Sequence, residues 1–409
     1  MKDETTNETT PSNRRNSVLE VLGVATRLGL TSFGGPIAHL GYFREEYVHR
    51  RKWLDEKAYA DLVALCQFLP GPASSQVGIA IGMIRAGLPG ALASWIGFTF
   101  PSALALVIFA YVLQRFQIQE MGWIHGLLVV AVAVVAQAVW GMARNLVPDR
   151  PRATIAFLAA IVAVTWQTAL GQVLIIVVAG LIGWWLLPKS SISESSSIRI
   201  PLSRKAALFS WGLFFALLLL LPLMRQISSI QWLAMFDSFY RTGSLVFGGG
   251  HVVLPLLQAE VVPTGWMTSD QFLAGYGAAQ AVPGPLFTFA AYLGTVISGW
   301  PGALLATVAI FLPSYLLIIG ALPFWDWIRR QPKFQAALSG INAAVVGILL
   351  AALYDPVWTK AIHTPADFSL ALISFGLLMI WKLPPWVVVL FSAIGGAILS
   401  LFSNNPVLL

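Results

Sequence analysis

Two apolar segments, each interrupted by glycine or proline, occur together twice in this chain. The first interruption of each copy is Phe-Gly-Gly, and the second is a glutamine followed by Pro-Gly-Pro. Interruptions at membrane depth are tolerated only where protein or a water-filled cavity satisfies the freed backbone groups. Such a duplicated pair is typical of the binding region of a membrane transporter. The equivalent residues are Phe33, Gly34, Gly35, Gln67, Pro70, Gly71 and Pro72 in the first copy and Phe247, Gly248, Gly249, Gln280, Pro283, Gly284 and Pro285 in the second.

The composition places the chain in a membrane. Of the 409 residues, 57% are hydrophobic and only 11% are charged, unlike a soluble domain. The apolar runs predict an all-α polytopic membrane protein with about 13 hydrophobic segments. The formal net charge of +7 comes from short loops between these runs, so membrane topology explains it better than nucleic acid binding. The single cysteine, Cys66, excludes an internal disulfide.

The repeat divides the chain into four parts. Residues 1–17 are polar, lack the pattern of a signal peptide and are expected to form a disordered cytoplasmic tail. Residues 18–187 form the first transporter repeat and residues 228–409 the second, with equivalent residues 212–214 positions apart. Residues 188–227 hold a Ser-rich linker and one unpaired apolar span. A single extra span reverses the orientation of the second half, which predicts an inverted-topology repeat.

The distribution of charge indicates how the interrupted segments lie in the membrane. If each interrupted pair is a re-entrant hairpin, most Lys and Arg residues lie on the cytoplasmic side together with the N-terminus. If residues 18–33 crossed completely, the basic loop at residues 44–52 would face outward, against the positive-inside rule. The sequence therefore favours re-entrant hairpins.

The interrupted segments have the chemistry of an anion site. The first N–H groups of a helix have no intrahelical partner, and the helix dipole favours negative charge beside them. Glycine lets a ligand approach the backbone closely. Close helix packing is the alternative explanation for the same glycines and prolines. Further hydrogen-bond donors are available from Ser32, Gln67, Ser74, Ser75, Gln280 and Thr288.

Two arginines extend this hypothesis. Arg27 and Arg241 each lie six residues before the phenylalanine of a Phe-Gly-Gly triplet. A guanidinium group binds an oxyanion through paired hydrogen bonds, so two of them converging on one cavity would suit a tetrahedral dianion. The alternative is that an arginine reaches the membrane interface or pairs with Glu20 or Asp237.

Five other residues are candidates for coupling transport to a second ion, and protons are the ion considered. A histidine titrates near neutral pH, and the two glutamates of this set occupy equivalent positions in the halves. The alternatives are structural histidines, glutamates that form ion pairs with the basic segment, and an arginine that anchors the chain at the cytoplasmic surface. The five candidates are His39, Glu46, Arg85, His251 and Glu260.

Motifs of enzymes and ATP-driven pumps are missing from the sequence. It contains no G-x-S-x-G, no H-E-x-x-H, no Walker P-loop and no dinucleotide fingerprint. We therefore expect no enzyme, no metal site and no cofactor, and any transport would be driven by a gradient.

The residues around the interruptions resemble a known family. T-S-F-G-G-P-I-A-H-L-G-Y-F-R-E-E-Y and Q-F-L-P-G-P-A-S-S-Q-V-G in the first half, with F-G-G-G-H-V-V-L-P-L-L and Q-A-V-P-G-P in the second, are similar to the signatures of the chromate ion transporter family. The resemblance covers nearly the whole chain, as in the long two-domain members. It implies secondary active efflux of chromate across the bacterial inner membrane, which gives resistance. It points to Arg27, Phe33, Gly34, Gly35, Pro36, Pro70, Gly71, Pro72 and Arg85.

Three functions therefore stay open. The leading hypothesis is an exporter of the chromate dianion. A sulfate transporter is the first alternative, because sulfate has the same charge and shape. The second alternative is a membrane scaffold that uses the interruptions only for helix packing. The sequence leaves the direction of transport, the coupling ion and a possible homodimer open.

Overall fold

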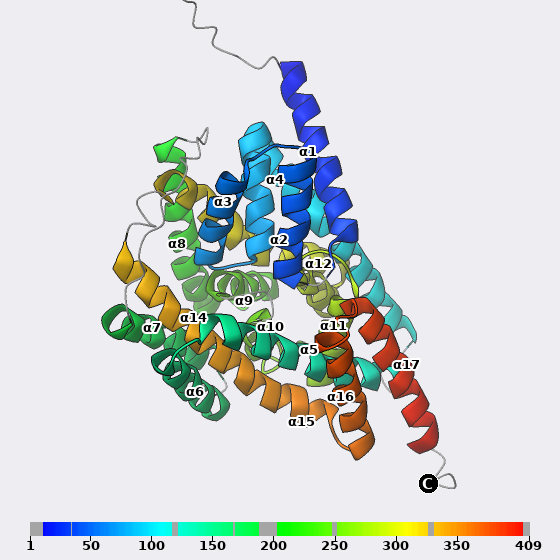
Figure 1. The fold of residues 1–409 in the computed structure, drawn as a ribbon. Coiled ribbons are helices and arrows are strands. Elements are labelled where there is room, and N and C mark those ends of the chain that lie inside the picture. The colour runs from blue at the N-terminus through cyan, green and yellow to red at the C-terminus, as the bar shows by residue number, and fades with distance from the viewer. Residues whose placement is uncertain are drawn as a thin grey trace, which may run out of the picture.

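The computed structural model describes residues 11–33, 35–116, 122–166, 168–187, 203–247, 252–325 and 331–403. Within these ranges the protein is helical and contains no strand (Figure 1). The α-helices are α1 (Pro11–Thr31), α2 (Gly35–Arg44), α3 (Glu56–Phe68), α4 (Ala73–Phe116), α5 (Gly122–Leu146), α6 (Arg150–Thr165), α7 (Ala169–Leu186), α8 (Arg204–Ile227), α9 (Gln231–Leu245), α10 (Val253–Val261), α11 (Ser269–Ala281), α12 (Phe289–Ala321), α14 (Pro332–Ala352), α15 (Thr359–Ala361), α16 (Pro365–Met379) and α17 (Pro385–Ser403). Two short segments are π-helical, η1 (Glu45–Arg50) and η6 (Leu353–Trp358), and two are 3-10 helices, η4 (Leu286–Thr288) and η5 (Leu322–Phe324).

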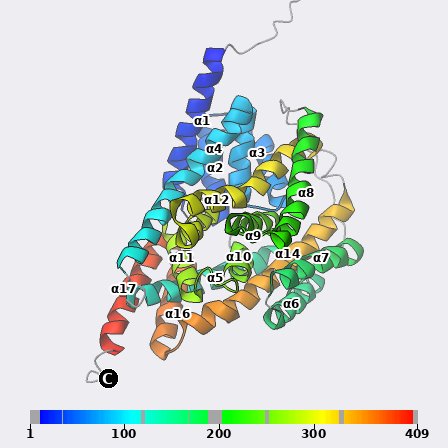
Figure 2. The same ribbon diagram turned by 180° about the vertical axis from the view of Figure 1, so that it is seen from behind.

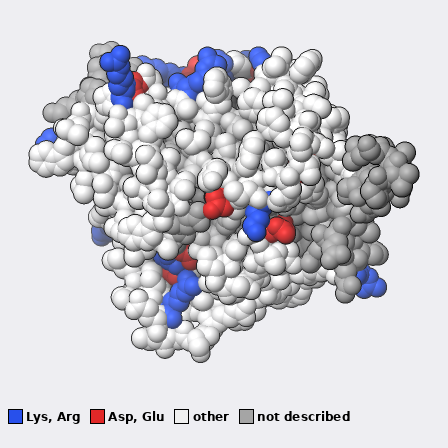
Figure 3. All heavy atoms as spheres, turned by 90° about the horizontal axis from the view of Figure 1, so that it is seen from below, with Lys and Arg blue, Asp and Glu red and all other residues white. Residues whose placement is uncertain are grey.

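Five helical stretches among the described residues are long and apolar enough to cross a membrane. They contain α4, α5, α8, α12 and α14, and shorter apolar helices are formed by α7, α16 and α17. Seen from below, most of the surface carries no charge, and the charged side chains gather in small groups (Figure 3). The chain is therefore a multi-pass helical membrane protein.

The predicted count of about 13 hydrophobic segments is not confirmed. Five stretches among the described residues are long and apolar enough to span a membrane, and in α4 and α12 the second arm of an interrupted pair is joined to the next apolar stretch through a non-helical break. The predicted tail is also shorter than expected, because α1 already begins at Pro11. Residues 1–10 and 188–202 lie outside the described residues, as do the candidates Gly34, Gly248, Gly249 and His251.

The two long helices bend at equivalent places. The bend in α4 lies at Ala86 and Gly87, and the bend in α12 lies at Ser298 and Gly299, 212 positions later. The two glycines have φ angles of 66° and 65°, a region that glycine enters without steric cost. Each long helix is thus two arms joined by a glycine bend, and the bend is part of the repeat.

Equivalent helices also begin with equivalent caps. The side chain of Asp55 accepts a hydrogen bond from the first turn of α3, and Thr268 caps α11 in the same way. Asp149 and Thr364 cap α6 and α16, and in each case a proline follows within the first two helical positions. Capping oxygens and early prolines define helix starts locally, so the sequence of each half sets the same boundaries.

The halves are interlocked by their last three helices. Helix α5 packs against α16 and α17 of the second half, whereas α14 packs against α6 and α7 of the first (Figure 1). The equivalent glycines Gly126 and Gly340 allow these close approaches, because a Cβ at either position would collide with a backbone carbonyl of Ser392 or Ala179. Helix α8, which has no equivalent in the first half, lies against α9 and α12 (Figure 2).

Candidate functional site

The Pro-Gly-Pro turn of each half contacts the end of the first interrupted helix of the other half. The amide of Gly71 donates a hydrogen bond to the carbonyl of Val246 (2.6 Å), and the amide of Gly284 donates one to the carbonyl of Ser32 (2.8 Å). Ser32 follows α1 and Val246 follows α9. We call these contacts the Gly71 crossing and the Gly284 crossing. They bring four interruptions, far apart in sequence, into two reciprocal contacts.

A serine from a long helix closes each crossing. A Cβ at position 71 would collide with Oγ of Ser314 on α12, and a Cβ at position 284 would lie 2.9 Å from Oγ of Ser102 on α4. Both glycines also have positive φ angles, 114° and 96°. Glycine is therefore needed at both turns for conformation and for the close approach of the other half.

Buried polar side chains surround the first turn of α4. Nδ1 of His39, on α2, lies 3.3 Å from Oγ of Ser74. Nε2 of Gln76 donates to the carbonyl of Pro70 (2.7 Å), which fixes the Pro-Gly-Pro turn against the helix that follows it. His39, Ser74 and Gln76 are each at most 1% exposed. This part of the first half is therefore a polar interior inside an otherwise apolar protein.

Five buried polar atoms at the two crossings have no hydrogen-bond partner among the described residues. A native structure pairs nearly all its buried polar groups, so each exception indicates a ligand, a water or a functional constraint. Nε2 of Gln280, in the second half, is a further exception. We call the five atoms the polar centre: Ser75 (Oγ) and Gln76 (Oε1) in the first turn of α4, Ser314 (Oγ) against Gly71, and Ser32 (Oγ) and Thr99 (Oγ1) beside the Gly284 crossing.

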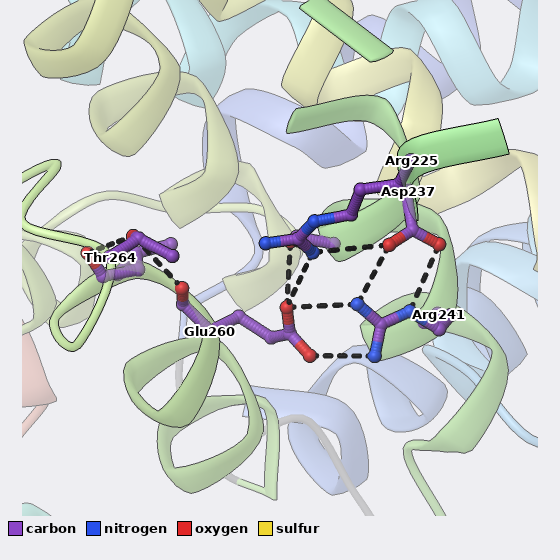
Figure 4. A network of polar contacts seen from close by, with 7 residues as sticks. Arg225, Asp237, Arg241, Glu260 and Thr264 are labelled. Atoms are coloured by element: carbon purple, nitrogen blue, oxygen red, sulfur yellow. Dashed lines mark hydrogen bonds and ion pairs between the residues drawn. The ribbon is translucent and has the colours of Figure 1, made fainter. Parts of the chain in front are cut away.

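Arg241 lies in a compact ion-pair network of the second half (Figure 4). Its guanidinium donates to both carboxylate oxygens of Asp237 (3.0 and 2.8 Å) and to both of Glu260 (2.8 and 3.0 Å). Arg225 of α8 adds bonds to Asp237 (3.1 Å) and Glu260 (3.4 Å), and Ser238 donates to Glu260 (2.7 Å). Pairing with Asp237, the alternative considered for Arg241, is thus the arrangement found. We call these five residues the second-half ion cluster.

Arg27 belongs to a looser cluster in the first half. Its guanidinium lies 3.9 Å from Glu46, and its side chain is 57% exposed. Glu46, the equivalent of Glu260, is held more closely by Arg51 (2.7 Å) and Arg50 (3.1 Å). We define the first-half ion cluster by the following set, in which Glu20 joins Arg51 (2.9 Å) to Arg85 (3.2 Å): Glu20, Arg27, Glu46, Arg50, Arg51 and Arg85.

The remaining predicted residues lie around these features. Gly35 starts α2 with a φ of 78°, and the ring of Phe33 lies 6.3 Å from that of Trp386. Gln67 is exposed. Thr288 uses its hydroxyl to bond the carbonyl of Pro285 (2.8 Å).

The ion pair considered as the alternative to coupling for Glu46 is formed with Arg50 and Arg51. The basic segment before α3 forms a further ion pair with Glu56. Arg44 donates to both carboxylate oxygens of Glu56 (2.9 and 3.2 Å). These hydrogen bonds hold the pKa of the exposed Glu56 carboxyl below its usual value.

Sequence reasoning missed several side chains that the structure brings to the site or beside it, Thr99 and Ser238 among them. Gln76 and Ser314 are in the polar centre, and Arg225 reaches the second-half ion cluster from the unpaired helix α8. The repeated Pro-Ser steps at Pro101-Ser102 and Pro313-Ser314 were visible in the sequence and signalled Ser314. No comparable signal marks Gln76 or Arg225, because neither has a polar equivalent at the matching place in the other half.

Two interlocked halves pair their interrupted helices around buried hydroxyls that have no partner in the described part of the chain. This arrangement is typical of a multi-pass membrane transport protein. The model of the chromate transporter family matches residues 19–184 and 233–397, one match in each half. The chain belongs to the chromate transporter family, and it is accordingly a transport protein and not an enzyme.

Two relatives of similar length are named as chromate transport proteins. The chain is 29% identical to a chromate transport protein of Pseudomonas aeruginosa, over 93% of this chain and 91% of the relative. It is 28% identical to a probable chromate transport protein of Synechococcus elongatus, over 91% and 93%. It is 34% identical to an uncharacterized transporter of Bacillus subtilis, but over only 28% of this chain and 66% of that relative. No solved structure matches the chain.

Proposed function

We propose that this protein is a secondary active exporter of tetrahedral oxyanions whose main substrate is chromate, and that it confers chromate resistance. The substrate binds at the polar centre, between the interrupted helices of the two halves. The observation that carries the proposal is the pair of reciprocal crossings beside buried hydroxyls without partners. Hydroxyl and backbone N–H donors at a helix start are the groups that an oxyanion needs. The names of the full-length relatives support chromate as the anion.

The membrane arrangement in this proposal is an inverted repeat in the bacterial inner membrane with a cytoplasmic N-terminus. The equivalent bends at Gly87 and Gly299 and the reciprocal bonds at Gly71 and Gly284 support a two-fold relation between the halves. The unpaired helix α8 supplies the single crossing that reverses the second half. The positive charge of the residue 44–52 loop supports the orientation.

The ion clusters provide the coupling step. Glu46 and Glu260 each hold two or more arginines, and each lies on the short helical segment that follows the Phe-Gly-Gly interruption. Protonation of either glutamate would weaken its ion pairs and free that segment to move relative to the neighbouring long helix. Protons are therefore the proposed coupling ion, and His39, bonded to Ser74, links α2 to the polar centre.

The test is uptake of labelled chromate and labelled sulfate into inverted membrane vesicles, with and without an imposed proton gradient. We expect gradient-dependent chromate accumulation that exceeds sulfate accumulation and is absent from vesicles without the protein. Accumulation driven equally for sulfate would favour the sulfate transporter. If neither anion accumulates although the protein is correctly inserted, the oxyanion transporter is wrong and the scaffold hypothesis remains.

A further inference from the structure

The two Pro-Gly-Pro turns differ in hydrogen-bonding capacity although their backbones are equivalent. At the Gly284 crossing, Thr288 donates to the carbonyl of Pro285 (2.8 Å) and Ser102 donates to the carbonyl of Thr99 (3.1 Å). At the Gly71 crossing the corresponding hydroxyls are Ser75 and Ser314, and neither has a partner among the described residues. At these two equivalent positions, therefore, only the Gly71 crossing keeps hydroxyl donors without a partner among the described residues, whereas the unpartnered hydroxyls beside the Gly284 crossing are those of Ser32 and Thr99.

Gln76 adds a hydrogen-bond acceptor to the two donors at the Gly71 crossing. Its equivalent in the second half is Phe289, which packs in the apolar core. Nε2 of Gln76 donates to the carbonyl of Pro70 (2.7 Å), and only the NH₂ end of an amide can donate to a carbonyl. The orientation of the amide is thus fixed by chemistry. Oε1 is left as a fully buried acceptor without a partner among the described side chains and backbone.

A buried acceptor is out of place in a site for a fully deprotonated anion. Such an anion has no hydrogen to donate to Oε1 of Gln76, and its negatively charged oxygens would repel that amide oxygen. Oγ of Ser314 and the amide of Gln76 both lie against Gly71, and Ser75 precedes Gln76 in the first turn of α4. A singly protonated oxyanion bound there would match all three groups, because its oxygens accept from Ser75 and Ser314 and its own hydroxyl donates to Gln76.

We propose, on the basis of the function proposed above, that the Gly71 crossing binds the singly protonated form of the oxyanion, with Ser75 and Ser314 as donors and Oε1 of Gln76 as acceptor. Binding of the protonated form would let the site discriminate chromate from sulfate and selenate, which have the same shape but carry no proton. Chromate takes up a proton just below neutral pH, so part of it is hydrogen chromate there, whereas sulfate and selenate stay dianions until the solution is strongly acidic.

His39 is the titratable side chain in contact with this turn, through Ser74. The contacts from α9 and α12 are made by the carbonyl of Val246 and by Ser314, which do not titrate. A His39→Gln variant therefore separates protonation of the ligand from protonation of the protein.

The experiment is equilibrium dialysis of the purified full-length protein in detergent, with labelled chromate and the same pH on both sides of the membrane. We expect binding to strengthen as pH falls from mildly alkaline to mildly acidic, in the wild type and in His39→Gln. Selenate, the closest unprotonated analogue, should compete about tenfold or more weakly than unlabelled chromate, because it leaves the Gln76 acceptor unpaired.

Three variants locate the effect. Gln76→Met removes the acceptor at similar side-chain length and should bring selenate close to chromate as a competitor. Ser314→Ala should weaken chromate binding about tenfold, whereas the matched Ser102→Ala should change it little, since Ser102 already has a partner. A folded Gln76→Met protein is checked by its unfolding temperature, and Ser314→Ala tests the site independently.

Two results would overturn the inference while leaving the transporter intact. One is equal competition by selenate and chromate in the wild type, and the other is chromate binding that does not change with pH. Failure to bind any oxyanion, together with no uptake into vesicles, would instead reject the proposed function itself.

Discussion

The two ion clusters occupy equivalent places in the two halves but differ in charge balance and in exposure. In the second-half ion cluster two arginines face two carboxylates, and the side chains of Asp237 and Glu260 are 0% and 8% exposed. In the first-half ion cluster four arginines surround Glu20 and Glu46, and Arg27 is mostly exposed. Ion pairs weaken steeply with exposure. The two copies of the repeat thus hold one ion cluster that is shielded from water and one whose ion pairs solvent can screen.

The largest difference between the clusters should appear when one carboxylate is removed from each. Asp237→Asn leaves Arg241 and Arg225 sharing only Glu260, in a site shielded from water. Removing one partner of a buried pair typically costs about 3–5 kcal/mol of unfolding free energy. We expect a loss of this size in chemical unfolding of the purified protein in mixed micelles, followed by tryptophan fluorescence.

Glu20→Gln is the control in the first half. Glu20 is 37% exposed and its partners keep other contacts, so the loss should not exceed about 1 kcal/mol. Equal losses for Asp237→Asn and Glu20→Gln would remove the distinction between a rigid and a screened cluster.

A smaller difference is expected between the two crossings. Alanine at position 71 or 284 must adopt a positive φ, a strain of about 1–3 kcal/mol, and Gly71→Ala in addition meets Ser314 Oγ. Combining Gly71→Ala with Ser314→Ala should recover part of the lost stability, since the colliding atom is gone. Unfolding of the single and double variants measures this recovery.

Gly284→Ala combined with Ser102→Ala is the matched comparison. Here the carbonyls of Phe98 (3.2 Å) and Gly29 (3.4 Å) still crowd the added Cβ, so little stability should return. Full recovery of stability in the Gly284→Ala/Ser102→Ala protein would show that backbone carbonyls do not crowd the added Cβ there. No recovery in the Gly71→Ala/Ser314→Ala protein would show that Ser314 Oγ is not the colliding atom at position 71.

Much of the fold could be predicted from the sequence, because helix breaks depend on residues that are close together in the chain. The interruptions at Phe33 and Pro70, and the matching ones in the second half, were read from glycine and proline, which break helices by their own geometry. Gly87 and Gly299 likewise divide the long helices α4 and α12 into two arms each, through a non-helical backbone at the bend. Hydropathy counts apolar runs, and it does not reveal where inside an apolar stretch the backbone leaves helical geometry.

The candidate site was accessible only in part, because its contacts join distant segments. The repeat identified both Pro-Gly-Pro turns, but the pairing of Gly71 with Val246 depends on how the halves interlock. The expectation that Arg27 and Arg241 serve one anion rested on sequence equivalence, and equivalence does not reveal that Asp237, with Gly23 at the matching place, pairs with only one of them. Polar partners that break the repeat are therefore the residues that a repeat-based interpretation misses.

The smallest expected effect on stability belongs to Arg27→Gln, and this makes it the most informative variant for function. Glu46 keeps its bonds to Arg50 and Arg51, and Arg27 is 57% exposed, so the unfolding free energy should fall by no more than about 1 kcal/mol. Arg241→Gln, in contrast, leaves two buried carboxylates with Arg225 alone and should destabilise the fold as Asp237→Asn does.

Loss of chromate uptake therefore has a different meaning in the two variants. In Arg27→Gln, unchanged unfolding with lost uptake would place this arginine on the path of the anion, and Arg27→Lys should then restore little, since an ammonium group cannot reproduce the paired bonds of a guanidinium. In Arg241→Gln the same loss would follow from instability. Unchanged uptake in Arg27→Gln would remove Arg27 from the path of the anion and leave the polar centre as the anion site of the first half.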